Sequence, residues 1–138
     1  MAYLHWTSDL ETGIAVIDKQ HRRIVDFINE LNDTDGLNEL ATTNHVLDKL
    51  VEYTRVHFSS EEEMLKNMNY PYLKAHKRIH ELFIKRVAEI QYRVRHGENV
   101  IQELLPMLRN WLINHIKGED AHYVESISNS LLIGEHSY

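Results

Sequence analysis

The chain has 138 residues, of which 43% are hydrophobic and 26% charged, so we predict a single domain over residues 1–138 with a buried core. Its formal net charge of −6 argues against nucleic acid or an anionic membrane surface as a partner, because both require basic patches. Because cysteine is absent, disulfides, thiolate metal sites, iron–sulfur clusters and a cysteine nucleophile are excluded.

Residues 1–17 carry no regular pattern, and we predict an irregular N-terminal arm that Trp6 anchors to the rest of the domain. The arm also lacks a basic stretch followed by an apolar run, which a secretory signal would need. No apolar run in the chain is long enough to span a membrane. We therefore expect no membrane insertion and a cytoplasmic location.

Beyond the arm, apolar residues recur every three or four positions, the period of amphipathic helices, and no alternating strand pattern stands out. The first helix is predicted from about residue 18 to 32, with Asp18 as its N-cap. The second is predicted from about residue 38 to 68, after the break at NDTDG. Pro71 suits the first position of a third helix, which ends at HGEN.

The fourth helix is predicted from the apolar residues between Ile101 and Ile116. Pro106 lies inside this pattern, so it should kink the helix or mark a later start. A short C-terminal helix is predicted to follow, through Tyr123 to Leu132. Four amphipathic helices with short connections favour an all-α fold, an up-down-up-down antiparallel four-helix bundle.

Ten histidines are present, and half of them fall on the apolar faces of these helices. In the third helix the inward positions are 73, 76, 80, 83, 87, 90 and 94, an unbroken alternation of three and four that includes two histidines. In the second helix a histidine and a glutamate occupy two successive inward positions. The inward-facing set is His21, His57, Glu61, His76, His80 and His115.

Burying these groups without partners would cost about 1–3 kcal/mol each, and more for an ionised carboxylate. The sum is roughly 7–20 kcal/mol, as large as the whole stability of a small domain, about 5–15 kcal/mol. Mutual hydrogen bonds would satisfy one or two of these groups, but not a set contributed by all four helices. A buried metal is the economical explanation, because imidazole and carboxylate are metal ligands.

Asp120 joins this set only under a condition on the backbone. It follows His115 by five residues, and five residues of an ideal helix turn about 140° past alignment. The two side chains reach one site only if the helix loosens by one residue, as a π-type turn does. Gly118 lies between them and makes that departure easier. We therefore predict non-α geometry over 115–120.

The order of these residues resembles the ligand pattern of hemerythrins: His21, then H-x-x-x-E at 57 and 61, H-x-x-x-H at 76 and 80, and H-x-x-x-x-D at 115 and 120. The resemblance covers nearly the whole chain. It includes IDKQH at 17–21, YP at 70–71 and WL at 111–112. Within that family the chain looks like a single-domain bacteriohemerythrin.

The resemblance implies a non-haem centre of two iron ions, Fe²⁺ or Fe³⁺, bridged by an oxo or hydroxo group, with dioxygen as the ligand. One coordination position would stay open, on the iron that has only two histidines. The implied ligands are His76, His80 and His115 for one iron, His21 and His57 for the other, and Glu61 and Asp120 as bridges.

Two further sets of side chains follow from the resemblance. The first is an oxygen pocket, in which two aliphatic residues line the oxygen side and two aromatic residues pack nearby, although core filling would also explain all four. The second is a single residue, Tyr123, which would contact the metal ligands without binding the metal itself. The alternative is that Tyr123 is a surface tyrosine. The four pocket residues are Phe58, Trp111, Leu112 and Ile116.

The implied function is reversible dioxygen binding for storage, carriage or local supply, without enzymatic activity, and an oxygen-consuming enzyme is a candidate recipient of the gas. A di-iron enzyme that handles oxygen, peroxide or nitric oxide, an oxygen or redox sensor, and iron storage are the alternatives.

Reading the residues alone leaves three rivals open. Ferritin-like proteins use carboxylate-rich sites with two E-x-x-H motifs, whereas this chain has one, from Glu119 to His122. A zinc site of three histidines and a carboxylate would leave two histidines without a purpose. A metal-free interaction or signalling bundle is the third.

The residues predicted to face solvent are His5, His45, His96, His122, His136, Glu62 and Glu63.

Overall fold

The computed structural model describes residues 3–34 and 40–126, and within these ranges it contains helices, turns and loops but no strand. The predicted all-α class is confirmed. The elements in chain order are the 3-10 helix η1 (Ser8–Leu10), α1 (Ala15–Thr34), α2 (Leu40–Asn67), α3 (Leu73–Arg95), α4 (Ile101–Asn114) and the π-helix η2 (His115–Asp120).

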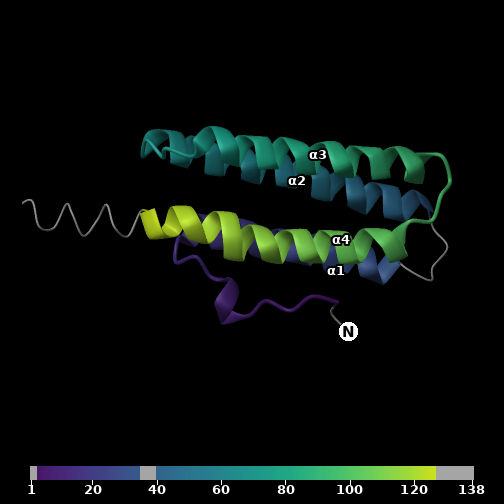
Figure 1. Cartoon of the computed structure of the whole chain (residues 1–138). Coiled ribbons are helices and arrows are strands. Elements are labelled where there is room, and N and C mark those ends of the chain that lie inside the picture. Colours follow the sequence, from purple (N-terminus) through teal and green to yellow (C-terminus); the bar gives the residue numbers. More distant parts are fainter. Residues whose placement is uncertain (1–2, 35–39, 127–138) are drawn as a thin grey trace, which may run out of the picture.

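The four long helices of the described chain form an antiparallel bundle (Figure 1). α1 packs against α2 and α4, and α2 packs against α3. Between α3 and α4, the rings of Phe83 and Trp111 stack with centroids 3.6 Å apart. Because chain direction alternates, the start of α1, the end of α2, the start of α3 and the end of α4 share one end of the bundle (Figure 1). This is the predicted up-down-up-down topology.

Apolar side chains that recur every three or four residues fill the bundle, as the sequence pattern predicts. Burial decides two positions that the pattern left open: Leu65 and Leu112 are each 0% exposed, whereas Met64 and Trp111 are half-buried. Full burial of one leucine side chain stabilises the fold by about 1.5–3 kcal/mol. This packing holds the helices firmly around the polar residues that share their inner faces.

α1 begins at Ala15, so the prediction that Asp18 is its N-cap is wrong. The carboxylate of Asp18 instead accepts hydrogen bonds from the N–H and hydroxyl of Thr12, both at 2.7 Å, and from the N–H of Gly13 at 3.1 Å. Because the side chain reaches back to donors of the preceding loop, it caps that loop rather than the helix. Gly13 takes the left-handed φ of +86°, which glycine adopts at no steric cost.

One alternative predicted for each proline is wrong. Pro71 lies in a turn, and α3 begins two residues later at Leu73, with the N–H of His76 bonded to the carbonyl of the N-cap Tyr72 at 3.0 Å, so Pro71 does not take the first helical position. Pro106 does not delay α4, which begins at Ile101 and runs through the proline. The expectation of a later start is therefore wrong.

The N-terminal arm lies along the outside of the bundle, below α1 and α4 in Figure 1. Leu4 and the side chain of Asn29 exchange two hydrogen bonds, at 2.8 and 2.9 Å. Trp6 packs against the hydrophobic core, as predicted, with the Arg22 guanidinium 5.1 Å from its ring centroid.

The helix of α4 and η2 continues without a break to residue 126. The predicted C-terminal helix therefore begins as an extension of α4, and its remaining part, to Leu132, lies outside the described residues. Within the described ranges, no helix combines the length and apolar character that crossing a membrane requires.

Candidate metal centre

All seven predicted ligands lie together inside the bundle, at the end where α1 and α3 begin. None is more than 4% exposed. α1, α2, α3 and the η2 continuation of α4 all contribute, because each turns one or two polar positions of its inner face toward the same point. The contributors are His21 from α1, His57 and Glu61 from α2, His76 and His80 from α3, and His115 and Asp120 from η2.

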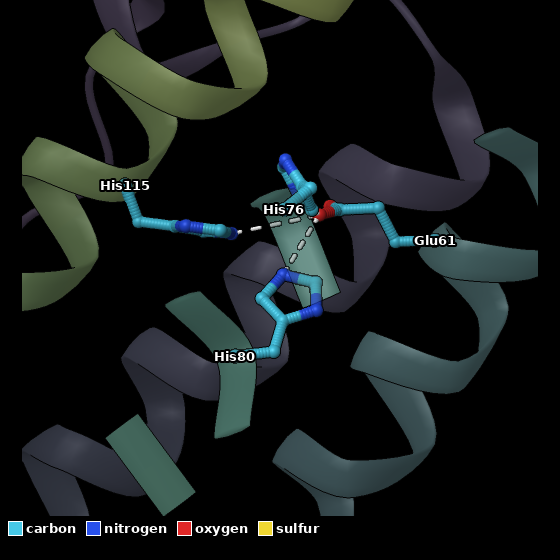
Figure 2. Close-up of side chains that lie close together, drawn as sticks. All are labelled: Glu61, His76, His80 and His115. Carbon is cyan, nitrogen blue, oxygen red and sulfur yellow. Dashed lines mark hydrogen bonds and ion pairs between the residues drawn. The ribbon is translucent and has the colours of Figure 1, made fainter. Parts of the chain in front are cut away.

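Glu61 is at the centre of the histidines (Figure 2). Its Oε1 atom makes a short contact with Nε2 of His76 and lies 3.2 Å from Nε2 of His80 and 3.6 Å from Nε2 of His115. Its other oxygen, Oε2, lies 3.4 Å from Nε2 of His57. One carboxylate thus faces imidazoles from three different elements.

Asp120 is the second carboxylate of the cluster and also faces three histidines. Its Oδ2 atom lies 3.0 Å from Nε2 of His21, and its Oδ1 atom lies 3.1 Å from Nε2 of His115 and 3.7 Å from Nε2 of His76.

The donor atoms divide into two groups, and within each group they lie within 4.8 Å of one another. The first group contains three histidines and Glu61, and the second contains two histidines with both carboxylates. Glu61 belongs to both, so the two groups share a ligand. The groups are Glu61, His76, His80 and His115, and His21, His57, Glu61 and Asp120.

The predicted departure from α-helix geometry is confirmed, because residues 115–120 form a π-helix. The wider turn brings Asp120 onto the face of His115, where both are buried. Gly118 is not needed for steric reasons: a Cβ atom added there would meet nothing within 4 Å. Its contribution is limited to its low preference for the regular α-helix.

The hydrogen bonding of the site leaves acceptors facing one another. Nδ1 of His57 lies 2.7 Å from Oε1 of Gln20, whose Nε2 donates to Ser60 Oγ at 3.2 Å. Since the amide oxygen can only accept, Nδ1 carries the proton of His57, and its Nε2 lone pair points toward the Glu61 carboxylate. Two acceptors in contact repel unless a cation lies between them.

Several buried nitrogen and oxygen atoms of the site also have no hydrogen-bond partner in the described chain. Imidazole nitrogen and carboxylate oxygen suit a first-row transition metal, and metal ions here would satisfy the Nε2 atoms and the Asp120 oxygens, one nitrogen from each imidazole. The residues therefore fit a metal centre. The unpaired ligand atoms are His21 Nδ1 and Nε2, His57 Nε2, His80 Nε2, His115 Nδ1 and Nε2, and both oxygens of Asp120.

Burial keeps the site ready for a metal. It lowers the pKa of His21 to about 4 and that of His57 to about 3, and it also lowers the pKa of His115. Burial alone would raise the pKa of Glu61, but the surrounding imidazoles, His115 first, hold that pKa well below its ordinary value. At neutral pH these histidines are uncharged and Glu61 is ionised, as metal binding requires.

Asp120 shows the opposite behaviour, because burial and then the charge of Glu61 raise its pKa well above the ordinary value. Two carboxylates in one buried site repel, and a cation between them removes that repulsion.

A family model described as the hemerythrin HHE cation binding domain matches residues 12–127. The chain belongs to the hemerythrin family. A bacteriohemerythrin of Pseudomonas aeruginosa (strain LESB58) is 47% identical over 131 residues, which are 95% of this chain and 86% of that protein. A myohemerythrin of Theromyzon tessulatum is 32% identical and covers 86% of this chain and 88% of its own length. A crystal structure of wild-type hemerythrin has a TM-score of 0.85 at 32% identity, covering 90% of this chain and 97% of that chain.

Tyr123 of this hemerythrin-family chain is fully buried, so the alternative of a surface tyrosine is wrong. Its hydroxyl donates to Oε2 of Glu61 at 3.3 Å, and burial raises the pKa of this hydroxyl. The hydroxyl therefore keeps its proton and holds the orientation of the Glu61 carboxylate.

The prediction that Glu62 points away from the site is wrong, because its Oε2 lies 2.8 Å from Nδ1 of His80. Glu63, the next residue, is exposed as predicted. Sequence reasoning also missed Gln20. A sequence signal existed for both Glu62 and Gln20. Each is a polar residue adjacent in sequence to a predicted ligand, and a metal-binding histidine needs an acceptor for its second nitrogen.

The four residues of the predicted oxygen pocket are packed at the edge of the site. Phe58 stacks on the ring of His80 with centroids 3.7 Å apart, and Trp111 stacks on His115 at 4.8 Å. Leu112 and Ile116 are buried in the main hydrophobic core. These contacts are what core filling requires, and a role toward dioxygen stays a prediction.

Four of the five histidines predicted to face solvent are exposed, and the fifth, His136, lies outside the described residues. His122 still has a partner, because its Nδ1 lies 2.6 Å from the hydroxyl of Tyr70.

Proposed function

We propose that this protein binds dioxygen reversibly at a non-haem di-iron centre and serves as a store, carrier or local supply of oxygen. The observation that carries the proposal is the pair of buried donor groups joined by Glu61, one with three imidazoles and the other with two. With both carboxylates shared, the metal with three imidazoles would have five ligand residues and the metal with two would have four, so the second would have the free position. Membership of the hemerythrin family supports iron as the metal.

The ligand assignment is part of the proposal. The histidines of α3 with His115 would hold the first iron, and those of α1 and α2 would hold the second. Glu61 and Asp120 would be shared between the two, because each carboxylate faces imidazoles of both groups. When bound, such an iron pair supplies electrons that dioxygen takes up and returns. The five imidazoles against two carboxylates distinguish the site from the carboxylate-rich centres of ferritin-like proteins.

Neighbouring side chains shield the site from water and hold the Glu61 carboxylate in one orientation. Stacked rings cover His80 and His115, which are 2% and 3% exposed, so water has little access to these two ligands. The hydroxyl of Tyr123 donates a hydrogen bond to Glu61 Oε2 and orients this carboxylate. A dry site matters because protons from water would promote irreversible oxidation of the bound metal.

The decisive test is optical. The iron-loaded protein, reduced without air, should be nearly colourless, develop a visible charge-transfer band in air, and lose the band when the gas is removed. Zinc-loaded protein is the control and should stay colourless throughout. Irreversible bleaching, or steady consumption of oxygen faster than autooxidation, would favour a di-iron enzyme instead.

The π-helix supports a second test, in which Gly118 is deleted. The deletion places histidine and aspartate four residues apart, and four residues of a regular α-helix turn about 400°, which is close to alignment. We therefore expect the variant to bind both metals with an affinity within about tenfold of the original, while η2 becomes α-helical. Metal content and amide hydrogen exchange measure the two effects.

Deletion of Asn110 is the matched control. This residue is exposed and lies in the regular part of α4, so its loss rotates both ligands by about 100° relative to the preceding core residues. We expect metal binding to be lost. If the Gly118 deletion lost metal to the same extent, the wider turn itself would be required.

A further inference from the structure

Two histidines of the site have side-chain partners at the nitrogen that faces away from the carboxylates, and the partners differ in charge. Nδ1 of His57 lies 2.7 Å from the amide oxygen of Gln20. Nδ1 of His80 lies 2.8 Å from the carboxylate of Glu62. His57 and His80 belong to different donor groups, so each proposed iron has one histidine whose outer nitrogen is hydrogen-bonded to a side chain.

Gln20 is a neutral acceptor with a defined orientation. Its Nε2 donates to Ser60 Oγ at 3.2 Å, which leaves Oε1 directed at His57. Gln20 and Ser60 are both half-buried, so water competes weakly for these bonds. The imidazole of His57 therefore donates its Nδ1 proton to an uncharged group.

Glu62 offers an acceptor of a different kind. Its side chain is 24% exposed, while His80 is 2% exposed, so the carboxylate keeps some contact with water as it receives the buried N–H. A hydrogen bond to a carboxylate is roughly twice as strong as one between neutral groups. It draws the Nδ1 proton away from the ring, and the other nitrogen of the ring becomes a stronger donor to a metal.

We propose that Gln20 and Glu62 are positioning residues that make the two metal positions electronically unequal. Glu62 strengthens His80 as a ligand and stabilises the higher oxidation state of the metal bound by α3 and His115. Gln20 orients His57 without adding charge, so the other metal keeps the higher reduction potential. This inference rests on the proposed di-iron function.

The test uses full-length Glu62→Gln, Gln20→Glu and the double variant, each loaded with iron. Glu63→Gln is the matched control, because it removes the same charge one residue further along α2 from an exposed side chain. Reductive titration with dithionite should give a more positive midpoint potential for Glu62→Gln and a more negative one for Gln20→Glu. Glu63→Gln should match the original protein.

A second readout does not need iron. We expect Glu62→Gln to bind Zn²⁺ about 10–100-fold more weakly in a chelator competition, because loss of an outer hydrogen-bond partner has effects of this size. In the NMR spectrum of the zinc-loaded protein, the His80 Nδ1 proton should resonate far downfield and move upfield in Glu62→Gln alone. The same variant should leave the His57 Nδ1 proton unchanged.

Equal shifts in Glu62→Gln and Glu63→Gln would overturn the inference, because long-range charge would then explain the effect without the hydrogen bond. An unmoved His80 proton signal in Glu62→Gln would overturn it as well. Failure of the di-iron proposal has a different signature: the original protein would bind Zn²⁺ and show the downfield proton, but would not take up two irons or change colour with oxygen.

Discussion

Glu61→Ala is expected to abolish binding of both irons and, with it, the oxygen-dependent colour. The Glu61 carboxylate lies within 3.6 Å of an imidazole nitrogen in each of His57, His76, His80 and His115. Alanine therefore removes a ligand from both metals at once and leaves the histidines without their shared anion. Metal analysis after loading, together with the visible spectrum in air, measures the loss.

Glu63→Ala serves as the control, since it removes a carboxylate two residues along the same helix from a side chain that is exposed. It should keep full iron content and colour. Far-UV circular dichroism of both variants separates loss of metal from loss of helix. A Glu61→Ala protein that is folded and retains the original iron content would remove Glu61 from the ligand set.

Removal of the metals is expected to lower the free energy of unfolding by several kcal/mol. Each buried polar atom left without a partner costs about 1–3 kcal/mol, and atoms of His21, His57, His80, His115 and Asp120 are in this position within the described chain. The total is comparable with the whole stability of a small domain, about 5–15 kcal/mol. Urea unfolding of loaded and metal-depleted protein measures the difference.

The metal-depleted protein is also expected to be acid-labile. The pKa of His21 is about 4 and that of His57 about 3 in the folded chain, whereas both return to about 6.5 on unfolding. The unfolded chain therefore binds protons first as the pH falls, so stability is present above pH 6.5 and is lost progressively toward pH 4. The raised pKa of Asp120 changes stability in the opposite direction. It is a single group, however, whereas the pKa values of three histidines, His21, His57 and His115, are lowered.

Between pH 6.5 and pH 5, each of these two histidines should account for about 2 kcal/mol of lost stability. Urea unfolding at pH 7.5 and pH 5 tests this expectation in the absence of metal. His57→Gln should reduce the dependence on pH, and His45→Gln, which changes an exposed histidine, should not. Equal stability at the two pH values would show that the buried histidines already have partners.

The ligands were predictable because they interrupt a strong pattern. His76 and His80 occupy two inward places in an otherwise apolar helical face, and burial of both follows from that period alone. The π-turn was predictable for a related reason, since no regular helix brings residues 115 and 120 to one face.

Features that depend on side-chain reach were not predictable in the same way. Asp18 resembles an N-cap locally, but its carboxylate reaches back to Thr12 and Gly13 because the loop before α1 folds over it. Glu62 resembles a solvated neighbour of Glu61, but the approach of α3 brings His80 within 2.8 Å of it. In both cases the partner comes from a segment whose position periodicity does not specify.

The sequence by itself determined the helices, their inward faces and the identity of the buried donors, because hydrophobic period is a local property of the chain. Only the tertiary structure decided which atoms of those donors face one another, how they divide into two groups sharing Glu61, and which neighbours support them. The physical reason is that ligand geometry and hydrogen bonding depend on distances of a few tenths of an ångström between helices, and those distances are set by how the whole core packs.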